Sequence, residues 1–317
     1  MPTLLTNPKM DPALVARIEA SLARRSGHAG REIYRPKWIA LARVLGVLAI
    51  AFTVYQVYRS QKAVRDRFEA RRNALLEAAG KHQLTPAERE VLPRVESAVK
   101  RLAASYEGDL IAPELALDAV LAKPMIYVSG LVNDFSGDRP VAVGASESTK
   151  DAFLYCMFAP PTARDDKTLH AKVLEWRALP GLDERTPNVS LLRDAEAGVP
   201  LLLPKWLDQV KKASSGIELG QLEGAFAKSP AEKAKRAAGA RFLLAAFDEG
   251  IGAAAFEGDR AHDTRVLLFD LSLDKPLLRL RKHVDPSFIP EARRRKYSVE
   301  MDQCAIAFDV RATTALR

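Results

Sequence analysis

The two cysteines are the residues of this chain best suited to form a covalent cross-link. Cys156 lies in YCMF and Cys304 in QCAIAF, so both have apolar neighbours, and the chain has no other cysteine. An even number of cysteines in a domain outside the cytoplasm permits one disulfide, here closing a loop of about 150 residues. Two buried, reduced thiols are the alternative. Neither cysteine has a second Cys or His at zinc-site spacing, so we expect no metal and no cofactor.

A second group of reactive residues is the serine pair Ser146 and Ser148 in GASES. The segment differs from the G-x-S-x-G nucleophile elbow because Ser148 occupies the place of the last glycine. An apolar run that reads as a strand, PVAVGA, precedes it, as that motif requires. A nucleophilic serine also needs a base, and the candidates are His170, His262 and His283. A lone histidine is more often structural or solvated, and the charged neighbours of His262 predict an exposed loop.

Glycines cluster in FDEGIGAAAFEGD, where Gly250 and Gly252 resemble the start of a phosphate-binding loop. Ala255 stands where the third glycine of that fingerprint falls, so a flexible connection between two strands is the better interpretation. Acidic residues near this loop could bind Ca²⁺ weakly, although the D-x-D-x-D-G pattern is missing. They are Asp248, Glu249, Glu257 and Asp259.

Four consecutive basic residues, Arg293 to Lys296, stand in the last quarter of the chain. A solvated first turn of the last helix explains them most simply. A docking patch for an acidic partner or for lipid is the alternative.

The most prominent element of the chain is one long apolar run, Trp38 to Tyr58. Its one charged residue is Arg43. A helix of this length matches the hydrocarbon thickness of a bilayer, about 30 Å. Trp38 at one end and Tyr55 and Tyr58 at the other suit the two membrane–water interfaces, and an Arg one turn inside can extend to the headgroups. A buried core helix and a cleaved signal peptide are the alternatives.

The basic residues of the chain concentrate around this run. Residues 1–72 carry 14 Lys and Arg against five acidic residues, which leaves a net charge of −1 for residues 73–317. A nucleic-acid-binding domain would carry its own basic surface, so we expect no nucleic-acid partner. Topology signals and contact with anionic lipid explain the juxtamembrane charge. The charges on the two sides are nearly balanced and do not orient the span. A short amino-terminal tail and a permitted disulfide favour a large domain outside the cytoplasm.

The chain divides into five predicted segments. A polar tail with a short amphipathic helix, 1–36, precedes a transmembrane helix, 37–58. A helical stalk covers 59–80, a helical segment 81–123 and a globular domain 124–317. The stalk carries apolar residues at heptad-like spacing, which indicates either a dimer contact or packing on its own domain; these are Val57, Val64, Phe68 and Leu75.

Short apolar runs predict the strands of the globular domain. The first group is MIYVSG, PVAVGA and AFLYCMF; the second is RFLLAAFDEG, RVLLFDLSL and PLLRLRKHV. Helical segments lie between the groups, and a turn at Lys275 and Pro276 makes the last two strands an antiparallel hairpin. An apolar helical face formed by Tyr297, Met301, Cys304, Ala305 and Phe308 predicts a terminal helix. The fold class is therefore α+β: a single transmembrane helix plus a helical stalk, then one mixed domain with short, largely antiparallel strands and several helices.

These observations predict a single-pass membrane-anchored protein whose globular domain binds or scaffolds an envelope partner and is not an enzyme. Its expected partners are the lipid bilayer and another protein, with a homodimer through the stalk. A membrane-anchored serine hydrolase and an accessory subunit of a membrane secretion or transport assembly are the alternatives.

Overall fold

The computed structural model describes residues 13, 16, 17, 19–21, 37–146, 151–162, 165–179, 185–229, 231–249, 261–285, 287 and 290–315. The chain forms two compact units, Met1–Arg67 and Phe68–Arg317. The second unit thus begins within the predicted stalk and includes the whole of 81–123. Most of the predicted tail helix lies outside the described residues, although its few described positions are helical.

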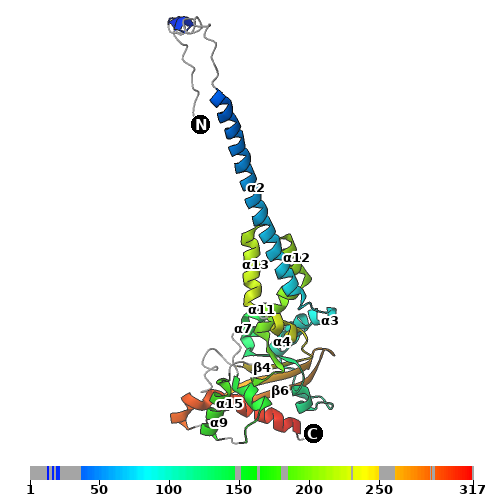
Figure 1. The fold of residues 1–317 in the computed structure, drawn as a ribbon. Helices are drawn as coiled ribbons and strands as arrows, with labels where there is room; N and C mark the ends of the chain where they lie inside the picture. The colour runs from blue at the N-terminus through cyan, green and yellow to red at the C-terminus, as the bar shows by residue number, and fades with distance from the viewer. Residues whose placement is uncertain are drawn as a thin grey trace. The chain divides into compact units, whose positions relative to one another are not determined.

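Helix α2, Lys37–Gly80, contains both the apolar run and the predicted stalk (Figure 1). A capping box follows it: the Thr85 hydroxyl accepts from the Glu88 N–H, and the Glu88 carboxylate accepts from the Thr85 N–H. This box starts α3, Pro86–Arg89, and α4, Val91–Ala103, comes next. The break between α3 and α4 lies at Glu90. Pro93 is in the first turn of α4, where its missing N–H has no intrahelical partner to lose.

The second unit is built on a six-stranded mixed sheet with the order β1-β6-β5-β4-β2-β3. Its strands are β1, Leu110–Ile111; β2, Met125–Leu131; β3, Val189–Leu191; β4, Phe242–Glu249; β5, His262–Asp270; and β6, Lys275–Val284. Strand β2 pairs in parallel with β3 and β4, and the other pairings are antiparallel. The two predicted strand groups therefore belong to one sheet, and the α+β class is confirmed.

Helices cover both faces of this sheet. On one face lie α8, Asp151–Phe158; α9, Asp166–Arg177; and α15, Glu291–Ala315, packed on sheet residues such as Tyr127, Leu244 and Leu268. The other face carries α4; α6, Val132–Phe135; α7, Val141–Ser146; α11, Leu192–Gly198; and α14, Ala231–Ala238. Alternate residues of β4 enter the two cores, so this strand is buried on both sides, as its nearly continuous apolar sequence predicts.

Two predicted strands are helices. PVAVGA forms α7 and AFLYCMF forms α8. Helix α8 is buried on nearly all sides, and the exposed residues of α7, Ala142 and Val143, are themselves apolar, so neither short sequence shows the polar face that would mark a helix. Both helices lie in the connection from β2 to β3, and parallel neighbours require such a crossover. The reverse error occurs in VSLLRDAEAG, one of the helical segments predicted between the two strand groups: its helix begins only at Leu192, and Val189–Leu191 is strand β3.

A hairpin joins β5 to β6, but its turn is Leu271–Asp274 rather than Lys275 and Pro276. The carboxylate of Asp270 holds this turn by accepting from the N–H groups of Ser272 and Leu273, at 2.8 and 3.1 Å. Pro276 lies inside β6 opposite Phe269, next to an irregularity in the register, where a missing N–H is tolerated.

A small third core joins the end of α2 to two further helices, α12, Pro204–Lys212, and α13, Gly216–Lys228. Leu75 and Ala79 of α2 are buried there against Trp206, Val210 and Leu219, and Phe68 packs at the margin. Phe68 and Leu75, the last two of the four residues at heptad-like spacing, therefore pack within their own chain.

We predict that Leu219→Ala destabilises the second unit by about 2–5 kcal/mol, because it empties a fully buried site in this core. Ile217→Ala, two residues away and exposed, is the matched control and should change the free energy of unfolding by less than about 0.5 kcal/mol. Denaturant unfolding followed by circular dichroism measures both. Equal effects would contradict the packing described.

Asp270 gives the hairpin a predicted pH dependence. Burial alone would raise the pKa of Asp270, but hydrogen bonds from Ser272 and Leu273 outweigh it and hold the pKa below its usual value. This stabilisation is complete above the ordinary carboxyl pKa, about 4, and disappears as pH falls through the lower folded-state pKa. Asp270→Ala should therefore cost about 1–3 kcal/mol at neutral pH and progressively less below about pH 4.

Unfolding measurements across this pH range test the effect. Asp270→Asn is the conservative control, since its amide oxygen still accepts from the turn but carries no charge. It should lose less stability than Asp270→Ala. A pH-independent difference between wild type and Asp270→Ala would refute the role of the charge.

Candidate functional site

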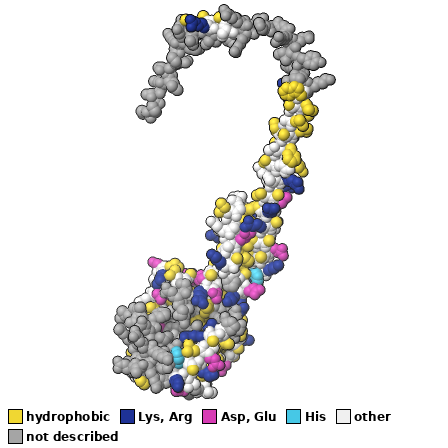
Figure 2. All heavy atoms as spheres, turned by 60° about the vertical axis from the view of Figure 1, so that its left-hand side comes forward, with side chains coloured by type: hydrophobic (Ala, Val, Ile, Leu, Met, Phe, Trp, Pro, Cys, Tyr) yellow, Lys and Arg dark blue, Asp and Glu magenta, His cyan; other side chains and the backbone are white. Residues whose placement is uncertain are grey.

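The most unusual surface of this protein is the apolar part of α2. Trp38 and the large apolar side chains from Leu41 to Tyr58 are exposed, and none of the apolar window is buried within the protein (Figure 2). Within the described residues, α2 is one helix long and apolar enough to cross a membrane, from Leu41 to Gly80. A core helix of a soluble protein would be mostly buried, so the exposure of this segment favours a membrane span over that alternative.

The polar groups of this segment have positions that suit a nonpolar environment. The Thr53 hydroxyl donates to the Ala49 carbonyl oxygen at 2.8 Å, so its polar hydrogen is satisfied within the helix. Trp38, Tyr55 and Tyr58 are exposed near the two ends of the apolar run. Arg43 is exposed one turn from its start, with a side chain long enough to extend towards that end.

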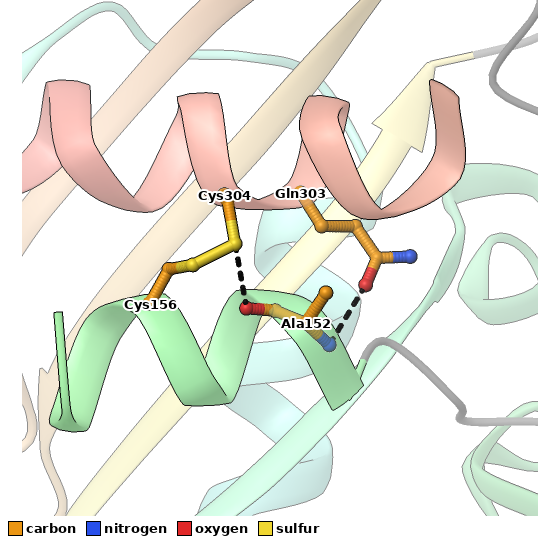
Figure 3. The surroundings of a disulfide bond; sticks show 4 residues. All are labelled: Ala152, Cys156, Gln303 and Cys304. Carbon is orange, nitrogen blue, oxygen red and sulfur yellow. Dashed lines mark hydrogen bonds between the residues drawn. A yellow bond between two sulfur atoms is a disulfide. The ribbon is translucent and has the colours of Figure 1, made fainter. Parts of the chain in front are cut away.

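Cys156 of α8 and Cys304 of α15 form a disulfide, with their Cα atoms 5.2 Å apart (Figure 3). Both residues are fully buried. The Cys304 sulfur also lies 3.4 Å from the Ala152 carbonyl oxygen. Gln303, next to Cys304, accepts a hydrogen bond from the Ala152 N–H at 3.1 Å, which satisfies a free donor in the first turn of α8. A covalent bond and a polar contact thus fix α15 on α8.

The structure does not support a serine nucleophile at Ser146. The expected strand before it is helix α7, so Ser146 ends a helix and the strand-to-helix elbow is absent there. Helix α7 packs on the sheet face opposite to that of α9, the helix of His170, and opposite to the face towards which His262 points. His283 is on β6, three strands or about 14 Å from β2, on which α7 packs. Ser148 lies outside the described residues.

A buried polar cluster that the sequence did not reveal lies at the carboxyl end of β4. The Thr264 hydroxyl donates to Asp248 Oδ1 at 2.7 Å, and His262 Nε2 lies 3.8 Å from the same oxygen. Ser129 on β2 faces the same side of the sheet. His262 begins β5 and is buried, so its predicted exposed loop is wrong. Only the pairing of β4 with β5 brings these residues together, and no local motif signals it.

This cluster contains an acid, an imidazole and a hydroxyl, which are the groups of general acid–base catalysis. All are nearly inaccessible to solvent, and Asp248 and Thr264 are hydrogen-bonded to each other. Buried polar groups that satisfy one another stabilise a unique core arrangement. We therefore assign the cluster a structural role.

The opposite face of the same strand ends carries an ionic network. Arg265 donates to the carbonyl oxygens of Leu102 and Ala104, at 2.6 and 2.8 Å, and pairs with Glu249 at 2.5 Å. It thereby supplies donors to the carboxyl end of α4. Arg281 pairs with both Glu249 and Asp263. The network locks α4 onto the sheet.

The same geometry contradicts a calcium site formed by Asp248 and Glu249. Neighbouring residues of a strand point to opposite faces, and here Asp248 contacts Thr264 whereas Glu249 contacts arginines. Glu257, Asp259 and the Gly250–Gly252 loop lie outside the described residues, as do the side chains of Arg293–Lys296. Within the described part of the chain, no group of three or more His, Cys, Asp or Glu residues could hold a metal ion.

The chain matches no protein-family model, no curated protein and no solved structure. The functional argument therefore depends on the geometry of the chain alone, and the exposed apolar helix and the fixed α8–α15 pair are its main elements.

We predict that the double variant Cys156→Ala/Cys304→Ala is less stable than wild type by about 2–5 kcal/mol, because removing the cross-link frees a long loop in the unfolded state. Denaturant unfolding with and without reductant measures the difference. Reductant should have little effect on the folded wild type, whose sulfur atoms are buried, and none on the variant. Equal stability of the two proteins would contradict the prediction.

Proposed function

We propose that this protein is a single-pass membrane anchor carrying a non-enzymatic domain, outside the cytoplasm, that binds or scaffolds an envelope partner. The observation that carries the proposal is the exposure of the apolar segment of α2, none of which is buried within the protein. In water, each exposed Leu, Ile or Phe forgoes about 1.5–3 kcal/mol of burial free energy. A bilayer removes that cost without any protein partner.

The domain offers three features in support of an extracytoplasmic scaffold. The Cys156–Cys304 bridge suits an oxidising compartment. The ionisable side chains at the sheet ends are engaged with one another and with the backbone, as the Arg265 network illustrates. The two-sided sheet is a rigid body of the kind that presents fixed surfaces to a partner. A homodimer through the stalk would have to use Val57 and Val64, since Phe68 and Leu75 contact their own unit.

Membrane extraction tests the anchor. We expect the wild-type chain to stay in the membrane pellet after alkaline carbonate treatment. Leu48→Arg/Ile50→Arg should release it, because each arginine at the centre of a span costs about 2.5–3.5 kcal/mol. Val64→Arg, beyond the apolar run, is the matched control and should stay in the pellet. Release of the wild type would refute the anchor.

Thiol labelling tests on which side of the membrane the second unit lies. The two native cysteines are bonded to each other, so an introduced cysteine is the labelled site. Leu174→Cys, on an exposed face of α9, should react with a membrane-impermeant maleimide in cells whose inner membrane is intact. Ala13→Cys should react only after that membrane is opened. The reverse pattern would place the domain in the cytoplasm.

Co-purification tests the partner. In mild detergent the full chain should purify with another protein, and a lone monomer would count against the scaffold.

A further inference from the structure

The turn between α12 and α13 has an exposed apolar tip. Ile217, in the first turn of α13, is 79% exposed, although it is a large aliphatic residue in a well-formed helix. Lys211 and Lys212 end α12 and are also exposed. Between them lie the small residues Ala213 to Gly216. Lysines beside an exposed aliphatic side chain are typical of segments that contact a membrane surface.

The tip is held in a defined shape by helix caps. The Ser215 hydroxyl accepts from the Glu218 N–H at 3.2 Å, and the Glu218 carboxylate accepts from the Ser214 N–H at 3.0 Å. Glu218 is thus engaged at the amino end of α13, and Asp208 pairs with Lys211 at 3.3 Å. The side chain of Ile217 is exposed rather than packed in a core, whereas Leu219, two residues later, is fully buried.

Contacts with α2 place this turn at the end of the second unit where the chain enters from the anchor. Pro204 and Leu207, early in α12, line the same small cavity as Gln83 and Leu84, which follow α2. Further along α12, the Lys211 carbonyl oxygen accepts from Arg72 at 3.4 Å. Helix α12 therefore runs back along α2 towards Phe68, and α13 returns, with Glu223 paired to Arg71 (Figure 1).

The length of chain between the apolar run and this end is short. Nine residues, 59–67, lie between Tyr58, the last residue of the apolar run, and Phe68, the first of the second unit. A helix rises about 15 Å from Tyr58 to Phe68, whereas the headgroup layer on each side of the hydrocarbon core is about 5–8 Å thick. Ile217 precedes Glu223, the partner of Arg71, by six residues, or about 9 Å of helix, so the tip of the turn extends from Arg71 towards the apolar run.

From these observations we propose that the α12–α13 turn is a second membrane contact, with Ile217 inserted among the lipid headgroups and Lys211 and Lys212 facing anionic lipid. The proposal rests on the membrane anchor proposed above. An aliphatic side chain leaving water and two lysines near an anionic surface both favour this contact. It would fix the orientation of the domain on the bilayer, which a single helix leaves free to rotate.

Lipid-borne quenching tests the contact in the full chain. Variants with one introduced cysteine, Ile217→Cys, Leu174→Cys or Val47→Cys, are labelled with a small environment-sensitive fluorophore and placed in nanodiscs of equal parts phosphatidylglycerol and phosphatidylcholine; the native cysteines are bonded to each other and do not react. In one set of nanodiscs part of the lipid carries a nitroxide at the headgroup end of an acyl chain, to quench at 217, and in a second set near the chain terminus, to quench at 47. Leu174 is the matched control: it is an exposed helical leucine, on α9 at the opposite end of the second unit from α13 (Figure 1).

We expect the probe at 217 to be quenched at least twofold more than the probe at 174, and Lys211→Gln/Lys212→Gln to reduce that difference. Equal quenching at 217 and 174, with strong quenching at 47, would overturn the second contact and leave the anchor intact. Absence of quenching at 47 would overturn the anchor, and the second contact with it.

Discussion

The burial of β4 on both faces is the constraint on which the second unit depends. A strand covered on both sides needs an apolar layer above and below the sheet, and the chain supplies α8, α9 and α15 on one face and α4, α7, α11 and α14 on the other. Polar residues at the carboxyl end of β4 must then find partners inside the protein. Asp248 does so with Thr264 on one face, and Glu249 with Arg265 on the other. The disulfide between α8 and α15 joins two of the helices that cover one face of the sheet.

The end of α2 connects this domain to the exposed apolar segment. Its last turns are not a free spacer, because Leu75 and Ala79 share a core with α12 and α13. The proposed contact at Ile217 lies beside this shared core, on the turn between α12 and α13.

Local sequence predicted the elements whose signals are local. Strands β2, β4, β5 and β6 and the terminal helix are confirmed, because long apolar runs and an apolar helical face need no knowledge of neighbours. The predictions for α7 and α8 were wrong for the opposite reason. A short sequence that is apolar on every face lacks the periodicity that separates a helix from a strand, and only the crossover between parallel strands requires a helix there.

What the sequence determined by itself is the apolar run of α2, the clustering of basic residues around it, and the presence of two cysteines among apolar residues. Composition and spacing along the chain are sufficient for these. Tertiary structure alone decided that Cys156 meets Cys304, that His262 is buried beside Asp248, and that Ile217 stays exposed while Leu219 does not. Each of these depends on strand register or helix packing between residues far apart in the chain, and such contacts leave no pattern in the local sequence.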